Sequence, residues 1–225
     1  MATLIHKLNL LLLEYENIKQ LRAILRIVYS KQLLNSIIDF SMNTDHFAQF
    51  GIRLLEILSL EYSYEIAKSD AIAVVFGLLR TNDYETVVQC LSFIKVLVSN
   101  CLVCEIDMKS NSLYDVKKEI KIGEILNKKL LVLVMRTVQK QPEIEYVACL
   151  LDIVNLVIKD KEMRDQILNT VLKEDEQTNT KIDYLKFLKT IDLQSDFRTI
   201  KELHKKISRQ IKELEIWGGC QSIKQ

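Results

Sequence analysis

The sequence predicts an all-helical protein, built from about three to four stacked helical units with a capping helix near its C-terminal end. The 225 residues include one proline and five glycines, whereas sheets and their tight turns normally use many of both. Apolar residues recur at helical spacing, and no stretch keeps the strict alternation of a strand. A similar apolar pattern returns in three segments, which indicates repeated structural units.

Composition and charge are those of an ordinary globular protein. Hydrophobic residues make up 48% of the chain and charged residues 27%, so a buried core is expected and disorder is not. The formal net charge is +1, which does not favour nucleic acid as a partner. No apolar run approaches the roughly 20 residues of a transmembrane helix, and the first residues lack the pattern of a secretory signal. Five cysteines scattered among apolar positions favour a reducing compartment, so we expect a cytoplasmic protein.

The repeat is carried by three segments, residues 50–58, 89–97 and 148–156. Each has apolar residues at its third, sixth and ninth places, which are Ile52/Leu55/Leu58, Leu91/Ile94/Leu97 and Leu150/Ile153/Leu156. The third places lie at 52, 91 and 150, so the offsets are 39 and 59 residues. The second offset corresponds to one repeat plus an insertion of about 20 residues, which the polar stretch 105–121 would supply.

The remaining elements follow from spacing and end signals. The first 40 residues resemble a degenerate capping repeat, and short helices are expected over 62–68 and 71–80. A long helix over 83–98 is expected to be capped by Asn82, with Glu85 completing a capping box. A further helix covers 144–158, with Pro142 tolerated near its first turn.

The C-terminal part is predicted to be a polar loop followed by a long amphipathic helix. The loop covers 173–181, with Thr180 as the cap of the next helix. The long helix covers 196–217 and is expected to end at Gly218 and Gly219. Its apolar spacing permits a capping helix or a short coiled-coil seam, and the capping helix is favoured because solenoid ends need covering. The apolar face consists of Ile200, Leu203, Ile207, Ile211 and Leu214.

The order of elements over 51–100 resembles an armadillo repeat. A long helix ends in Leu-Glu-Ile-Leu-Ser, and Glu-Ile-Ala-Lys-Ser-Asp-Ala-Ile, Leu-Leu-Arg and Asn-Asp lead into the next long helix. The resemblance is clearest over about residues 40–160 and is shared in part with HEAT-type repeats. It implies an α-solenoid with armadillo-like repeats over 1–172, including the insertion at about 105–121, then C-terminal capping helices over 181–217 and a tail over 218–225.

The resemblance also implies a binding groove. In the family, an aromatic residue and an asparagine one turn later on each long helix bind an extended peptide backbone. The aromatic places correspond here to Arg53, Ser92 and Leu151, and the asparagine places to Ile57, Val96 and Asn155. Only Asn155 keeps the family residue, so an apolar helix or a folded surface is the expected occupant.

A second candidate binding surface is a basic stripe on the C-terminal helix. Its members recur every three or four residues and are Arg198, Lys201, Lys205, Arg209 and Lys212. A solvated helix face is the ordinary interpretation, and an acidic protein surface such as a tubulin-type tail, or an anionic membrane, is the alternative. Nucleic acid is not expected, because no aromatic residues lie between the basic ones.

We expect no catalytic site, metal or cofactor. Cys101 and Cys104 form a CxxC without a second pair or a histidine at metal spacing, which favours two ordinary thiols. The three histidines are far apart, and Glu143 and Glu145 fit the first turn of a helix. The sequence therefore predicts a non-catalytic protein-binding scaffold or adaptor subunit of a larger complex. The alternative is a structural component of a cytoskeletal or axonemal, microtubule-associated assembly.

Overall fold

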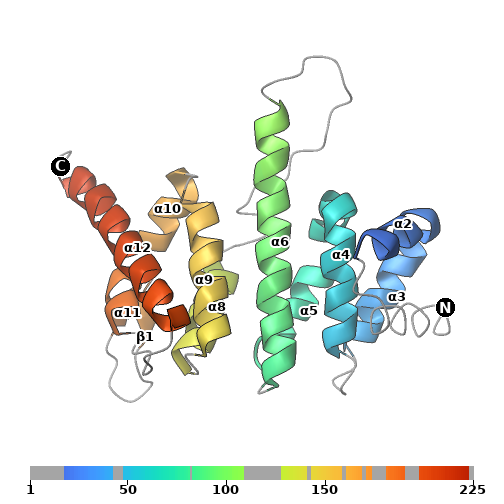
Figure 1. Cartoon of the computed structure of the whole chain (residues 1–225), viewed down its shortest axis with the longest axis horizontal. Coiled ribbons are helices and arrows are strands. Elements are labelled where there is room, and N and C mark those ends of the chain that lie inside the picture. Colours follow the sequence, from blue (N-terminus) through green and yellow to red (C-terminus); the bar gives the residue numbers. More distant parts are fainter. Residues whose placement is uncertain are drawn as a thin grey trace. The chain divides into compact units, whose positions relative to one another are not determined.

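The computed structural model describes residues 18–42, 48–81, 83–108, 128–140, 143–158, 161–168, 171–173, 181–190 and 198–222. The chain divides into two compact units, Met1–Ile125 and Leu126–Gln225, which are described separately (Figure 1). Helices make up most of the described residues, so the all-helical class is confirmed, whereas the stacked repeat remains a prediction. Among the described helices, none is long and apolar enough to cross a membrane.

The N-terminal unit is organised around a central helix, α4. Its elements are α2 (Ile18–Val28), α3 (Lys31–Met42), α4 (Ala48–Ala67), α5 (Ala71–Leu78) and α6 (Tyr84–Met108). Helix α4 contacts the other four. The apolar positions predicted for the first two repeat segments all lie in the core of the N-terminal unit, namely Ile52, Leu55, Leu58, Leu91, Ile94 and Leu97.

Helices α4 and α6 lie side by side and run in the same direction (Figure 1). The Glu56 carboxylate accepts hydrogen bonds from the Gln89 amide and, at 2.8 Å, from the Ser92 hydroxyl. Further along both helices, the Asn100 amide donates to the Ser59 carbonyl at 2.8 Å. The helices of the first two repeat segments therefore pair in parallel.

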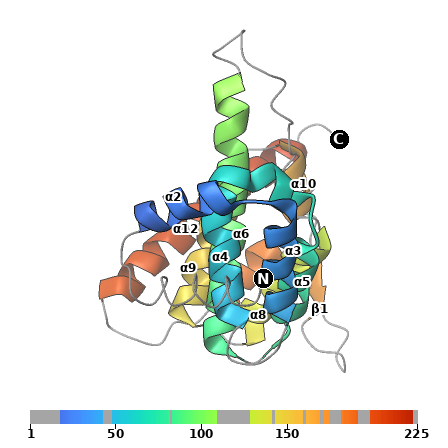
Figure 2. The same cartoon turned by 90° about the vertical axis from the view of Figure 1, so that its right-hand side faces the viewer.

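A kink divides α4 near its C-terminal end. Tyr62 has φ −121° and ψ 39°, outside the helical region, so the predicted short helix over 62–68 is the last part of α4 beyond this kink. Tyr29 stacks on Tyr62 with ring centroids 3.7 Å apart, and Arg26 pairs with Glu61 at 2.6 Å. Figure 2 shows α2 crossing α4 near this end, where these contacts join the two helices.

The start of α6 differs from the sequence prediction by one residue. The Thr86 backbone N–H donates to the Asp83 carboxylate at 3.0 Å, so Asp83 caps the helix and Asn82 was the wrong prediction. The cap must immediately precede the first helical residue, which is Tyr84, for its side chain to reach the third N–H. The insertion predicted from residue 105 was placed too early, since α6 continues to Met108, and 109–121 lie outside the described residues.

The C-terminal unit has α9 and α12 in contact, with α8 against α9 and α11 against α12. Its elements are α8 (Lys128–Lys140), α9 (Ile144–Val157), α10 (Lys161–Leu168), β1 (Val171–Lys173), β2 (Lys181–Asp183), α11 (Tyr184–Thr190) and α12 (Arg198–Ser222). Leu150 and Ile153 of the third repeat segment are buried, but Leu156 is half-buried and Val157 takes its place in the core. The third segment therefore matches the repeat at two of its three apolar positions.

Two boundaries of this unit correct the sequence prediction. β1 and β2 form a short antiparallel pair with Leu172 opposite Ile182, so the ends of the predicted loop are strands and the next helix begins at Tyr184 rather than after Thr180. The sequence predicted that this helix ends at Gly218 and Gly219, but α12 continues through both glycines to Ser222. A glycine ends a helix by adopting a left-handed conformation; inside a helix it is tolerated at a cost of about 1 kcal/mol.

Candidate protein-interaction surface

Helix α12 has one face buried against α9 and α11 of its own unit. Ile207 and Leu214 belong to this buried face, as their helical spacing predicted, and Ile211 is half-buried. Gln210 is also buried there, 1% exposed. The side chains of Ile200 and Leu203 lie outside the described part of α12.

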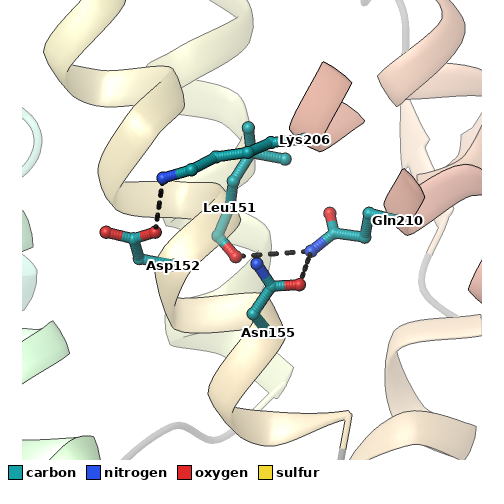
Figure 3. Close-up of polar contacts among 5 residues, drawn as sticks. All are labelled: Leu151, Asp152, Asn155, Lys206 and Gln210. Atoms are coloured by element: carbon teal, nitrogen blue, oxygen red, sulfur yellow. Dashed lines mark hydrogen bonds and ion pairs between the residues drawn. The ribbon is translucent and has the colours of Figure 1, made fainter. Parts of the chain in front are cut away.

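The Gln210 amide joins three helices, and Figure 3 shows its contacts with α9. Its nitrogen donates to the Asn155 side-chain oxygen at 2.9 Å and to the Leu151 carbonyl at 3.3 Å, both on α9. Its oxygen accepts a hydrogen bond from the buried Tyr184 hydroxyl of α11 at 2.9 Å. Because donor and acceptor sides are both used, Gln210 sets the rotation of α12 on its neighbours.

Sequence reasoning missed Gln210, because a polar residue on an amphipathic helix is ordinarily assigned to solvent. A signal was nevertheless present. Gln210 lies three residues after Ile207 and four before Leu214, which places it within the apolar row.

Two exposed ion pairs flank the buried contact. Lys206 lies 3.4 Å from Asp152 of α9, and Lys189 of α11 lies 2.7 Å from Glu215. Exposed pairs of this kind contribute about 0–1 kcal/mol each. The buried face, rather than these pairs, holds α12 in place.

Burial gives Tyr184 a pH-dependent effect on stability. It raises the pKa of the Tyr184 phenol well above the ordinary value of 10.0. The unfolded chain ionises this phenol near pH 10 while the folded chain keeps it protonated, so stability is lost as pH rises above that value. We expect urea unfolding of Tyr184→Phe to show a shallower loss of stability above about pH 10, by up to about 1.4 kcal/mol per pH unit. Equal slopes in the two proteins would contradict the buried, protonated phenol.

The outer face of α12 carries the described members of the predicted basic stripe. Lys205, Arg209 and Lys212 are all exposed. Arg209 pairs along the helix with Glu213 at 2.9 Å, whereas Lys205 and Lys212 form no ion pair with another described residue. Arg198 and Lys201 belong to α12, but their side chains lie outside the described residues.

A shallow hollow follows this outer face. Ile216 closes one end of it and is 66% exposed. The lining residues are His204, Lys205, Ser208, Arg209, Lys212, Glu213 and Ile216. The hollow therefore combines cationic groups with an exposed aliphatic side chain.

The residues of the predicted groove are distributed between the two units. In the N-terminal unit Arg53 is exposed, Ile57 is buried, and Ser92 and Val96 are half-buried. In the C-terminal unit the Leu151 side chain is fully buried and Asn155 is bonded to Gln210. Ile57 and Leu151 thus contribute to the cores of their units. The Asn155 side chain already forms a hydrogen bond with α12 of the same chain.

The described residues with nucleophilic or metal-binding chemistry do not converge. Burial raises the pKa of the Cys90 thiol and so disfavours its reactive thiolate. Among the described residues, no group of three or more His, Cys, Asp or Glu side chains could hold a metal ion. Cys101 and Cys104 lie in α6, but their side chains are outside the described residues. His6 and His46 also lie outside the described residues, and His204 lies on the outer face of α12.

Comparisons with protein-family models, with curated proteins and with solved structures found no match to this chain.

Proposed function

We propose that this chain is a non-catalytic protein-binding subunit that docks an acidic protein surface on the outer face of α12. The observation that carries the proposal is the division of this helix into two faces. One is fixed to α9 and α11 through Gln210, and the other presents Lys205, Arg209 and Lys212 to solvent. Because the helix backbone is already held in place, docking orders only the exposed side chains, which lowers the entropic cost of binding.

Charge and apolar contact have different roles in this proposal. A single exposed ion pair contributes only about 0.2–1 kcal/mol, so charge mainly steers encounter and sets orientation. Affinity needs a buried anchor as well, and Ile216 lies at the end of the same hollow. The combination favours a folded acidic surface that carries apolar residues.

The armadillo-like arrangement is part of the same proposal for the N-terminal unit. The parallel pairing of α4 and α6, the equivalent buried positions 39 residues apart (52 and 91) and the kink at Tyr62 support it. Armadillo-like folds commonly serve as protein-binding scaffolds, so this support is by analogy of fold.

Affinity capture with quantitative mass spectrometry tests the docking face. We expect the wild-type chain to recover a small set of proteins from its native cells. Recovery of at least one should fall about tenfold in the variant Lys205→Glu with Lys212→Glu, because two attractions become repulsions.

A matched control is available on α8. Arg136 and Lys140 are exposed on a helix of the same unit, so Arg136→Glu with Lys140→Glu makes the same change in net charge at a different place. Its recovery should equal that of the wild type. Equal losses of recovery in both variants would show that net charge alone causes the effect, and would contradict the proposal. Retention in an insoluble cytoskeletal fraction, insensitive to both variants, would favour the structural-component alternative.

A further inference from the structure

The hollow on α12 has the form of a groove between two ridges of side chains. Residues four apart on a helix form a ridge, and two adjacent ridges enclose a groove. The lining residues fall into two such rows, His204–Ser208–Lys212–Ile216 and Lys205–Arg209–Glu213. Ser208 is the smallest of them and lies in the middle of its row, where a short side chain permits close approach.

A groove of this kind fits a ridge of another helix. Helices that pack in this way cross at about −50° or about +20°, and both geometries keep several turns in contact. An extended peptide fits less well, because the backbone N–H and C=O groups of α12 are bonded within the helix and cannot replace the water that an extended backbone would lose. A helical occupant satisfies its own backbone.

The charges and the apolar end of the groove define the chemistry of that helix. Lys205 and Lys212 lie seven residues apart, about two helical turns, without an ion pair to a described residue. Acidic residues that recur every three or four positions on a partner helix would lie opposite both lysines. Ile216 requires an aliphatic residue on the same face of the partner.

We infer that the groove binds an amphipathic helix of another protein, in which an aliphatic residue lies among acidic residues at three- and four-residue spacing. The inference rests on the proposed docking function of this face and adds the conformation and chemistry of the partner. The association depends on rigid pairing of two helices, so helix formation by the partner is part of binding.

Three synthetic peptides of about 20 residues, long enough to form a helix, test this inference. One has leucine and glutamate on one helical face, the second has the same composition in scrambled order, and the third is the first with a central proline. We expect the patterned peptide to bind the full chain about tenfold or more tighter than either control in fluorescence anisotropy at low salt, since proline breaks the helix. Circular dichroism should show a gain of helix on binding.

Variants of the chain locate the site. Lys205→Glu with Lys212→Glu should weaken binding of the patterned peptide about tenfold or more, and Ile216→Ser about fivefold, because its side chain is the apolar anchor. Arg136→Glu with Lys140→Glu should leave the affinity unchanged. Thermal melting curves equal to the wild type would show that these exposed substitutions act on binding and not on folding.

The outcomes separate this inference from the proposed function. Equal affinity for the patterned and proline peptides would overturn the helical partner. Binding of phosphatidylserine vesicles, with no patterned peptide bound, would overturn the protein partner and indicate a membrane surface. If the patterned peptide does not bind while cellular capture stays sensitive to Lys205→Glu with Lys212→Glu, the inference fails and the proposed function stands. If capture is insensitive as well, both fail.

Discussion

Replacing Gln210 by alanine is expected to lower the free energy of unfolding of the C-terminal unit by about 3 kcal/mol. The substitution leaves the buried Tyr184 hydroxyl without its acceptor and empties a position where three helices meet. An orphaned buried polar group costs about 1–3 kcal/mol, and the lost packing adds to it. Hydrogen exchange with mass spectrometry over α9, α11 and α12 measures the loss in this unit.

A thermodynamic cycle separates the hydrogen bond from the packing. Gln210→Leu alone should be strongly destabilising because the Tyr184 hydroxyl remains buried. Adding Tyr184→Phe to it should recover the part of the loss, about 1–3 kcal/mol, that comes from the orphaned hydroxyl, while the half-buried Asn155 oxygen still lacks the donor that Gln210 supplied. If Tyr184→Phe costs the same in both backgrounds, the two side chains are not coupled, and Gln210 does not set the position of α12.

The helical class was predictable because it depends on spacing that every segment carries. Leu91 and Ile94 recur at helical intervals, and only a helix buries both on one side. Ends of helices were less predictable, because neighbouring residues compete for the same role. Asn82 and Asp83 are both good caps, and the choice depends on where the first turn packs.

The proposed interaction surface was predictable only in its outer half. The basic stripe is a local pattern on one helix, so Lys205, Arg209 and Lys212 could be assigned to one face from spacing alone. The inner half depends on tertiary contacts. Asn155 was a candidate for partner binding, but its oxygen accepts from Gln210, 55 residues away in the sequence, and no local pattern specifies that pairing.

The close crossing of α3 and α4 gives the second large expected effect. Gly51 lies where a Cβ would overlap the Ser41 hydroxyl and come within 3.1 Å of the Ser41 Cα. Ser41 is buried, and its hydroxyl donates to the Ile37 carbonyl at 2.8 Å, so it is not free to move away. Only glycine lets the two helices approach this closely.

Gly51→Ala is therefore expected to destabilise the N-terminal unit by about 2 kcal/mol, because overpacking outweighs the gain in helix propensity. Gly77→Ala is the matched control in α5. A Cβ at residue 77 would meet nothing within 4 Å, so there the propensity gain of about 0.5–1 kcal/mol should appear as stabilisation. Hydrogen exchange with mass spectrometry over α3, α4 and α5 measures both changes. Opposite signs would show that backbone approach decides the effect, and two stabilised variants would mean that α3 and α4 separate without cost.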